Sequence, residues 1–534
     1  MSRVLIVGSG ATGVHFAATA LERGHDVVML DVGYERPAPV AADQDFDGLK
    51  ETLEDPVAYF LGASGETVVY PEPQAKFYGF PPSKTYVFSP PGRFASEENG
   101  FAAVTSFAAG GLAEAWTGGV YPLNDAELVD FPFDHAALAP HYAAVARRIG
   151  ISAAEDDLAR FAAWFPEYQP ALEADSHSKL LLARYARARD WFHRRHGFYL
   201  GRSRVAVLSQ ALGDRNACDY LGRCLWGCPR DSLYVPSATL RELRRHPRFQ
   251  YVSGVYVEYF NGTGGRIERI IASPVAGGEP LEFTADQYVL AAGALCSSRI
   301  VLESHFRATG QVVELSGLMD NRQLMIPFIT LRLLGAPAAT HSYQFHQVAL
   351  GISGPDPRGY VHGQITALKA ASVHPIVQSM PLDTRSALAL FRATHAALGV
   401  ANVWLHDTRR DGNRLTIRPG PEGDRTSMVM RYQVSDDDAP RVSRTLGTMK
   451  RALWKLGAIV PPGMTKILPP GSSIHYAGTL PMAAQKQPFT CDAWCRSHDW
   501  ENLYYADGAT FPFLPAKNLT YTLMANAVRV ANTL

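Results

Sequence analysis

The sequence predicts an α/β protein, α+β overall, in which a parallel sheet and an antiparallel β-sheet belong to two different domains. Three observations support this prediction. A strand, a helix and a second strand follow one another within residues 1–33, and a buried strand again enters a glycine turn in residues 288–294. Between about 325 and 455, short segments alternate apolar and polar side chains, which is typical of an antiparallel sheet with one face toward water.

The composition narrows the classes of function. The 534 residues carry 51 Lys and Arg against 51 Asp and Glu, so no net charge attracts nucleic acid or an anionic membrane. With 47% hydrophobic and 19% charged residues, the chain has an ordinary globular composition. Its start leads directly into a strand rather than into the apolar run of a signal peptide, and no apolar run is long enough to span a membrane. We therefore expect a cytoplasmic protein that binds neither nucleic acid nor membrane.

A glycine-rich turn follows the first strand of the chain. Gly8 permits the tight turn, Gly10 allows the backbone to approach a pyrophosphate, and Gly13 lets the helix pack closely on the strand. The N–H groups that begin the helix favour phosphates, and Asp31, which ends the second strand, can accept hydrogen bonds from a ribose. A tight turn without a nucleotide is the alternative. The unit predicts a Rossmann-like domain whose dinucleotide contacts are Gly8, Gly10, Ala11, Thr12, Gly13 and Asp31.

The rest of the chain divides into segments of different character. Residues 37–101 are rich in Pro, Tyr and Phe with little periodicity, which suggests a lid or an association arm. Further strands are expected near 249–252, 256–260, 266–271, 288–294, 328–333, 402–405 and 503–508, with helices through 300–302 and over 519–534. We assign residues 1–36, 102–160, 215–325 and 455–534 to the nucleotide-binding domain, and residues 161–214 and 326–454 to a substrate-binding domain.

Four motifs in this order resemble the glucose–methanol–choline (GMC) family of flavin oxidoreductases. The first is the N-terminal fingerprint, and the second is the glycine-flanked segment from Gly110 to Gly119. The third is residues 289–299, a strand and turn followed by a helix. The fourth is a C-terminal pair, residues 475–482 and residues 502–518. The likeness spans nearly the whole chain and is weakest between about 330 and 455.

The resemblance implies FAD, held by the fingerprint and by distant segments. Val257 falls where the family holds adenine through backbone atoms, and Asp507 with Gly508 resembles a second flavin contact. Taken alone, the last two residues would also fit a plain turn after a strand. The other residues that the resemblance implies at the cofactor are Gly110, Gly111, Trp116, Thr117, Gly118, Ala292, Gly293, Asn518 and Leu519.

The resemblance also places His475 and Asn518 at the chemistry. An imidazole that titrates near neutrality suits removal of a hydroxyl proton, and an amide can orient the substrate oxygen and stabilise its charge. Each residue has a structural alternative, because His475 would also fit a buried structural histidine and Asn518 would fit the N-cap of a helix beginning at Leu519. That helix would direct its positive end at the flavin.

Two expected absences follow from particular positions. In some relatives a histidine directly before the Trp of the glycine-flanked segment bonds covalently to the flavin, but Ala115 stands there, so we expect non-covalent FAD. The spacing of Cys218, Cys224, Cys228, Cys491 and Cys495 fits no standard zinc or iron–sulfur site. Reduced thiols and no metal are therefore expected.

The expected function is FAD-dependent oxidation of an alcohol group, in a sugar, glycoside or polyol, to a carbonyl. Oxygen or a quinone-like compound would accept the electrons, and association into a homo-oligomer stays open. Polar aromatic and histidine side chains could line the substrate pocket or the water-facing side of a sheet: Tyr343, Phe345, His346, Tyr360, His362, Trp404 and His406. The alternatives are a non-redox lyase of hydroxynitrile-lyase type, a catalytically silent flavin-binding protein, and an NAD-dependent dehydrogenase that uses only the N-terminal fingerprint.

Overall fold

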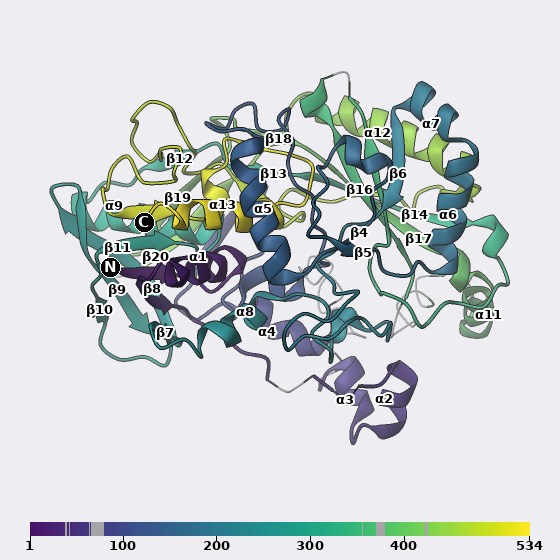
Figure 1. The fold of residues 1–534 in the computed structure, drawn as a ribbon, viewed down its shortest axis with the longest axis horizontal. Helices are drawn as coiled ribbons and strands as arrows, with labels where there is room; N and C mark the ends of the chain where they lie inside the picture. The colour runs from purple at the N-terminus through teal and green to yellow at the C-terminus, as the bar shows by residue number, and fades with distance from the viewer. Residues whose placement is uncertain are drawn as a thin grey trace.

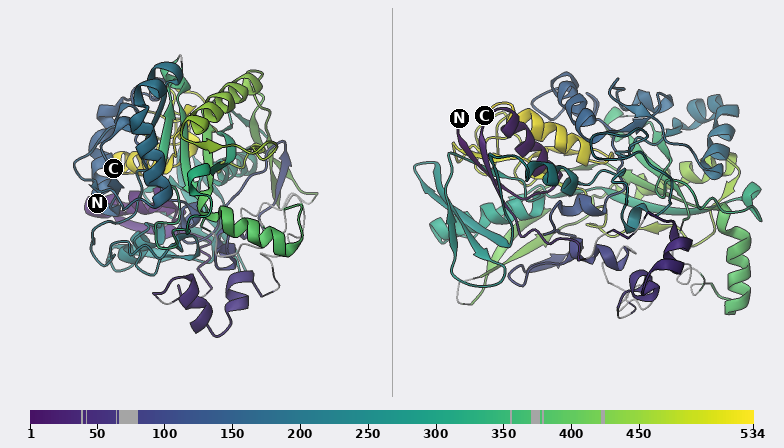
Figure 2. Two further views of the ribbon diagram at one scale, coloured as in Figure 1. Left: turned by 90° about the vertical axis from the view of Figure 1, so that its right-hand side faces the viewer. Right: turned by 60° about the horizontal axis from the view of Figure 1, so that its bottom comes forward.

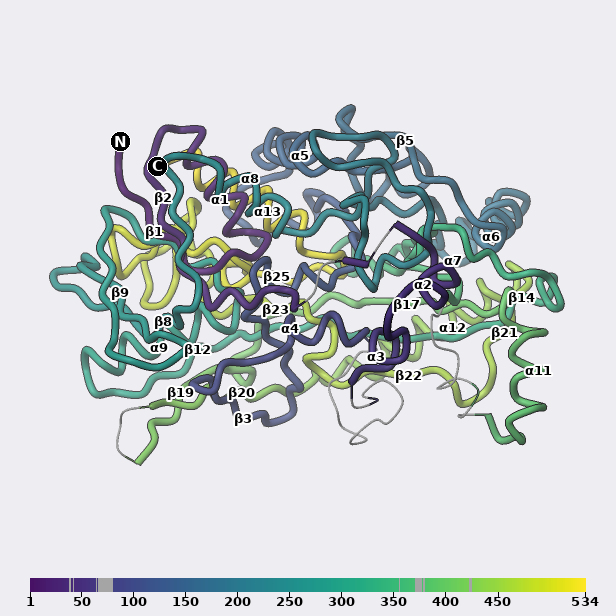
Figure 3. Tube along the Cα trace, turned by 90° about the horizontal axis from the view of Figure 1, so that it is seen from below, coloured from purple at the N-terminus to yellow at the C-terminus, as the bar shows by residue number. Residues whose placement is uncertain are grey.

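Two sheets organise an elongated molecule, one toward each end (Figures 1 and 2). The computed structural model describes residues 1–534 except 38–39, 42, 64, 66–79, 355, 370–376, 378–379 and 422–424. The two ends of the chain lie close together beside the first sheet (Figures 1 and 3). This closeness arises because segments from the beginning, middle and end of the chain all contribute to that sheet.

The first sheet is parallel and has five strands. In order they are β24 (Leu503–Tyr505), β11 (Gln287–Leu290), β1 (Arg3–Val7), β2 (Asp26–Leu30) and β7 (Phe249–Val252). The side chains of Val4, Ile6 and Val289 are completely buried, as continuous apolar strands require when both faces of a sheet are covered. The predicted α/β class is confirmed.

Helices cover one face of this sheet, and a small antiparallel sheet lies on the other side. Helix α1 (Ala11–Glu22) packs against α8 (Pro236–Leu243) and α13 (Thr520–Ala531), and α13 also contacts α5 (His135–Ile149). The small sheet consists of the antiparallel strands β8 (Val255–Thr263), β9 (Arg266–Pro274) and β10 (Leu281–Phe283), and β8 packs against α9 (Ala294–Thr309). The strand predicted over 288–294 ends earlier, at Leu290, because Gly293 adopts a left-handed conformation (φ 83°) directly before α9.

The second large sheet is antiparallel and has seven strands. Six form a path: β21 (Ala458–Ile459), β14 (Arg322–Thr330), β17 (Leu398–Leu405), β16 (Val361–Ala367), β15 (Val348–Ile352) and β6 (Phe198–Arg202); β22 (Lys466–Ile467) pairs with β14. One face packs its apolar side chains against α6 (Ser176–Arg187), α7 (Arg189–His196) and α12 (Asp438–Lys455). The predicted antiparallel sheet is therefore present, although residues 331–333 form a 3₁₀ turn rather than strand.

A mixed four-stranded sheet connects distant segments: β12 (Glu314–Ser316), β19 (Arg414–Pro419), β20 (Thr426–Arg431) and β3 (Ser96–Asn99). Leu415, Ile417, Met428 and Met430 are buried in the core of the nucleotide-binding part, although the sequence analysis assigned 326–454 to the substrate-binding domain. Strand pairing explains this burial, because β19 pairs with β12 and packs against α9, and both of these elements belong to the nucleotide-binding part. The remaining boundaries stay a prediction.

The Pro-rich segment 37–101 contains helices α2 (Phe46–Thr52), α3 (Pro56–Leu61) and α4 (Thr85–Phe88). Helices α2 and α3 project from the body of the molecule (Figure 1). Aromatic contacts attach them, since Tyr59 stacks on Trp226 at 5.3 Å between ring centroids. Part of this segment lies outside the described residues, and its role as a lid or an arm stays a prediction.

Short strand pairs bring the C-terminal segment to the middle of the molecule. Strand β13 (Met319–Asp320) pairs antiparallel with β23 (Tyr476–Ala477), and β18 (Asp407–Thr408) pairs with β25 (Phe513–Leu514). A third pair, β4 (Ser152–Ala153) with β5 (Gln169–Pro170), lies after α5. Among the described helices, none combines the length and the apolar character that crossing a membrane would need.

Candidate active site

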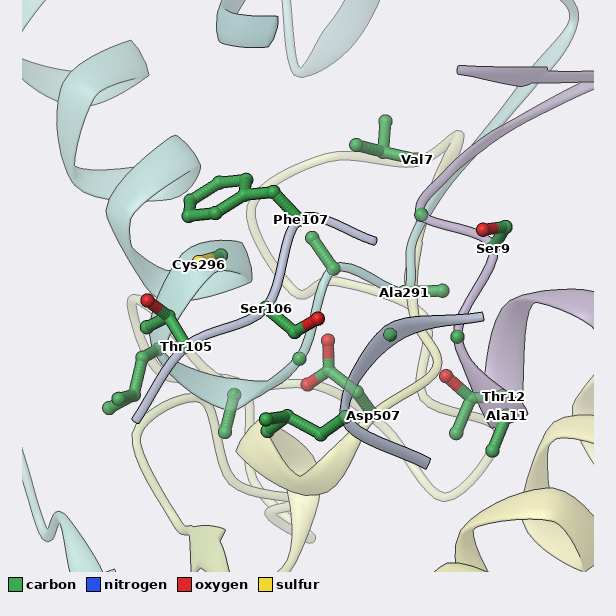
Figure 4. A pocket seen from close by; sticks show the side chains of 18 of the residues that line it. Val7, Ser9, Ala11, Thr12, Thr105, Ser106, Phe107, Ala291, Cys296 and Asp507 are labelled. Atoms are coloured by element: carbon green, nitrogen blue, oxygen red, sulfur yellow. The ribbon is translucent and has the colours of Figure 1, made fainter. Parts of the chain in front are cut away.

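A cleft lies at the carboxyl ends of the parallel strands, where ligands bind in open α/β sheets. It holds about 1300 Å³ of empty space, including the part that is open to solvent. In Figure 4, Ser9, Ala11 and Thr12 lie on one side of it, and Phe107 and Cys296 lie on the other. The predicted site residues that line it are Gly8, Gly10, Ala11, Thr12, Asp31, Gly111, Val257, Ala292, Gly293, His475, Asp507, Gly508 and Leu519.

The glycines of the N-terminal turn have three different roles. Gly8 is left-handed (φ 101°), and a Cβ on Gly13 would lie 2.0 Å from the Gly8 carbonyl oxygen, so Gly13 allows helix and strand to meet. A Cβ on Gly10 would contact no protein atom within 4 Å. Gly10 caps α1 without a side-chain hydrogen bond, so N–H groups of the first helical turn remain for a ligand. This cradle fits the phosphates of a dinucleotide.

Asp31 closes one end of the cradle. Its carboxylate accepts hydrogen bonds from the backbone N–H and the hydroxyl of Ser9 and from the Tyr251 hydroxyl. Burial raises the pKa of Asp31 to about 6, against the opposing effect of these donors. A carboxylate held on the cleft in this way can accept hydrogen bonds from ribose hydroxyls, as predicted.

Asp507 lies on the cleft with the strand–turn–helix motif. It accepts hydrogen bonds from the Ser297 hydroxyl at 2.5 Å and from the Ala509 backbone N–H at 3.0 Å. Burial raises its pKa to about 6. The residues after β24 and those after β11 are thereby joined directly at the cofactor cleft, a link that neither motif shows alone.

Val257 also lies on the cleft, but its carbonyl oxygen already accepts a hydrogen bond from the Arg299 guanidinium. That guanidinium lies 4.7 Å above the centre of the Tyr256 ring. If the Val257 carbonyl oxygen also accepts a hydrogen bond from an adenine, it must accept that bond in addition to the one from Arg299.

Part of the glycine-flanked loop does not line the cleft, which corrects the sequence-based assignment. The backbone N–H of Gly110 donates to the Ser9 hydroxyl, so Gly110 lies behind Ser9. Trp116 donates its indole N–H to the Tyr234 carbonyl at 2.6 Å and, with Ala115, lines a second cavity instead. The carbonyl oxygens of Thr117 and Gly118 are likewise bound by Tyr343 and Ala206. The change occurs within the 3₁₀ turn Gly111–Ala115, because its first three residues line the cleft whereas Glu114, Ala115 and Trp116 line the second cavity.

His475 reaches the cleft from the segment before β23. Its ring Nδ1 lies 2.9 Å from Asn321 Oδ1, and its backbone N–H donates to the Ser473 hydroxyl. The surrounding protein partly removes the ring from water, and this desolvation lowers the pKa of His475 to about 4. The imidazole is therefore neutral at pH 7. Ile474, just before it, has φ 61°, an unusual conformation for a β-branched residue, which indicates a strained backbone next to the catalytic candidate.

Asn518 does not line this cleft, and it is not the N-cap of α13. The N-cap is Leu519 and makes no side-chain hydrogen bond, so the predicted capping role of Asn518 is wrong. Its Oδ1 instead accepts a hydrogen bond from Gln364 Nε2 at 2.7 Å. Leu519 and Thr520, at the positive end of α13, do line the cleft, so Asn518 stands directly beside it.

Two site residues were missed by the sequence analysis. Asn321 contacts His475 and also donates from Nδ2 to the carbonyl oxygens of Leu405 and Pro515. It follows β13, whose pairing with β23 was not visible in the sequence. Gln364 lies in the middle of β16. The alternation of side chains along a strand predicts which face of the sheet it occupies but not its contact with Asn518.

The polar aromatic residues of the second sheet lie inside the molecule, so for most of them the interpretation as a water-facing surface is wrong. His362 is completely buried, and Trp404 is 7% exposed. Their rings stack at 6.1 Å, and Trp404 lies 6.1 Å from the His475 ring. Tyr343, His346 and Tyr360 are also buried. The face of the sheet opposite α6, α7 and α12 therefore faces the catalytic candidates.

The cysteines stay without an assigned function. All six are free thiols, and Cys491 and Cys495 are completely buried. Within the described ranges, no group of three or more His, Cys, Asp or Glu side chains is placed to hold a metal.

The parallel sheet, the phosphate cradle and the adjoining antiparallel sheet are features of a dinucleotide-binding oxidoreductase. In the comparison with known proteins, residues 355–527 match the family model described as GMC oxidoreductase. Similar proteins include paromamine 6'-oxidase from Streptomyces fradiae, 23% identical over 99% of this chain and 90% of that protein. Pyranose 2-oxidase from Lyophyllum shimeji is 24% identical over 47% of this chain and 44% of that protein.

Solved structures agree on the fold. Pyridoxine 4-oxidase from Mesorbium loti superposes with a TM-score of 0.61 at 17% identity, covering 100% of this chain and 99% of that one. An FAD-dependent oxidoreductase from Chaetomium thermophilum gives 0.59 at 14% identity, covering 100% and 98%. These findings agree with the resemblance to GMC oxidoreductases that the four motifs predicted. The family implies FAD, and the cradle, Asp31 and Asp507 fit that group.

Proposed function

We propose that this protein oxidises an alcohol group of a sugar, amino sugar or polyol to a carbonyl, using non-covalently bound FAD. The observation that carries the proposal is the position of His475, a neutral imidazole on the same cleft as the phosphate cradle, with Asn518 beside that cleft. When bound, FAD supplies a hydride acceptor at flavin N5.

The chain's own side chains supply the proton chemistry. His475 accepts the hydroxyl proton, because a neutral imidazole has a free lone pair. The Asn518 amide donates a hydrogen bond to the substrate oxygen and stabilises its developing charge. The positive end of α13, which lies on the cleft, favours negative charge there.

The substrate class rests on the relatives and on the sheet face beside His475. The two oxidases compared above are named for paromamine and for a pyranose. Trp404 and His362 offer flat rings with polar edges, which suit the apolar faces and hydroxyl groups of a sugar. The electron acceptor that we propose is oxygen or a quinone-like compound.

Anaerobic mixing with a panel of sugars, amino sugars and polyols tests the proposal. An alcohol substrate should bleach the flavin of the purified holoprotein, whereas a lyase or a silent flavin-binding protein would keep its oxidised spectrum. His475→Ala should retain FAD but reduce it at least about 100-fold more slowly, as expected on loss of a general base. The exposed His246→Ala variant serves as the control and should match the wild type. An unchanged rate in His475→Ala would remove this residue from the mechanism.

A further inference from the structure

Each of the two candidate catalytic side chains forms a hydrogen bond with a buried side-chain amide from a distant part of the chain. Asn321, 1% exposed, contacts His475, and Gln364, 2% exposed, contacts Asn518. Asn321 lies between β13 and β14 and Gln364 lies in β16, whereas His475 and Asn518 belong to the C-terminal segment. The contacts therefore connect the two parts of the site.

Asn321 can present only its oxygen to His475. Its Nδ2 donates at 3.0 Å to the carbonyl of Leu405 and at 3.0 Å to the carbonyl of Pro515. A carbonyl oxygen only accepts, so both amide hydrogens are used and the amide cannot be turned around without facing oxygen to oxygen. The group that faces His475 Nδ1 at 2.9 Å is thus an acceptor.

An acceptor at that position fixes the tautomer of a neutral imidazole. Nδ1 must carry the hydrogen that Asn321 accepts, which leaves the lone pair on Nε2. The pairing of Asp320 with Tyr476 across β13 and β23 holds Asn321 opposite His475. A neutral amide also differs from a carboxylate here, because it orients the ring without favouring its protonated form.

Gln364 acts on Asn518 in the corresponding way. It donates from Nε2 to Asn518 Oδ1 at 2.7 Å, so the oxygen of Asn518 is occupied and its Nδ2 hydrogens stay available as donors. Gln364 lies on the same sheet face as His362, because the two residues are separated by one position in β16.

We propose that Asn321 and Gln364 are positioning residues that assign opposite hydrogen-bonding roles to the two catalytic side chains. Asn321 makes His475 Nε2 the proton acceptor, and Gln364 makes Asn518 Nδ2 the donor to the substrate oxygen. A hydroxyl group placed between them donates its proton to one and accepts from the other. This inference rests on the proposed function, but its first half concerns a proton position that exists without substrate.

The first test measures that proton position directly. In protein labelled with ¹⁵N-histidine, the His475 resonances, assigned by comparison with His475→Gln, should show a protonated Nδ1 and an unprotonated Nε2 at pH 7. Asn321→Leu should shift the population toward the other tautomer. Asn321→Asp keeps an acceptor toward Nδ1, and its second oxygen must be protonated to donate to the carbonyls of Leu405 and Pro515, so this variant should retain the tautomer. A wild-type ring protonated on Nε2, or a tautomer unchanged in Asn321→Leu, would overturn this half.

The second test uses Gln364→Glu, which replaces the donor by an acceptor and turns the Asn518 amide around. Flavin reduction by the best substrate of the panel should slow about 10²- to 10³-fold, as when one oxyanion donor is lost, with FAD content unchanged. The exposed Gln311→Glu makes the same substitution outside the cleft and should change the rate less than about threefold.

The Asn518→His background separates positioning from general damage. An imidazole N–H can donate without the orientation that Gln364 imposes on an amide, so Gln364→Glu should cost less than about threefold there. An equal loss in both backgrounds, or no loss in the wild-type background, would overturn the second half. If no compound of the panel reduces the wild-type flavin, the proposed function fails, while the ¹⁵N measurement still decides the role of Asn321.

Discussion

The residue directly before Asn518 forms a buried ion pair whose removal should destabilise the protein strongly. The side chains of Lys517 and Glu127 are 0% and 1% exposed. Lys517 Nζ donates to the Glu127 carboxylate and also to the carbonyl oxygens of Pro122 and Phe161. Burial lowers the pKa of Lys517, and the carboxylate beside it opposes that shift.

Lys517→Met keeps the length of the side chain but leaves Glu127 charged and without its cation. Breaking a buried pair in this way costs about 3–5 kcal/mol of the free energy of unfolding. Adding Glu127→Gln removes the charge that was left behind, so the double variant should recover part of the loss rather than add to it. Urea unfolding followed by flavin fluorescence measures all three proteins against the wild type.

The comparison between the single and the double variant decides the result. A loss of less than about 1 kcal/mol in Lys517→Met would show that the pair is solvated, because exposed pairs contribute that little. Strictly additive losses in the double variant would show that the two groups act independently. Either result would contradict the packing around Lys517.

Three further predictions concern the cleft. Because the pKa of His475 is about 4 rather than 6.5, about 0.9 of the imidazole is still neutral at pH 5, against about 0.03 for an ordinary histidine. The base is lost only as the pH falls through about 4, so flavin reduction should stay flat from pH 8 to 5, and a loss centred near pH 6.5 would contradict the lowered pKa of His475. Gly10→Val should fold normally but bind no FAD, whereas Gly13→Val should lose about 3 kcal/mol or more of the free energy of unfolding, since only the side chain at position 13 collides with the protein. Normal FAD occupancy in Gly10→Val would refute the assignment of this turn to the phosphates. Acid precipitation should release all flavin into the supernatant, because Ala115 cannot form a covalent bond to it, and colour retained on the polypeptide would disprove this.

Local chemistry made the nucleotide-binding part predictable. The glycines at 8, 10 and 13, the apolar strand before them and Asp31 lie within one continuous stretch, and each has a role that its own conformation or size dictates. Features of this kind can be predicted from the local sequence alone, without knowledge of any distant contact.

Predictions that needed distant contacts were less complete. Asn518 has the residue type and position of an N-cap, but the competing hydrogen bond from Gln364, 154 residues away, decides what its side chain does. The glycine-flanked loop was assigned to the cofactor as a whole, whereas its 3₁₀ turn sends Trp116 to another cavity. Asn321 could not be predicted from the sequence, because its three hydrogen-bond partners come together only in the tertiary structure.

The position of β24 at the edge of the parallel sheet has a consequence for biosynthesis. Strand β1 emerges from the ribosome first, yet its neighbour β11 follows more than 280 residues later, and β24 closes the sheet only after residue 503. Such long sequence separations slow folding, because distant segments must meet before their contacts compensate for the lost chain entropy. A chain halted before residue 475 would lack both Asp507 and His475, so it could not form the cleft that these two residues line.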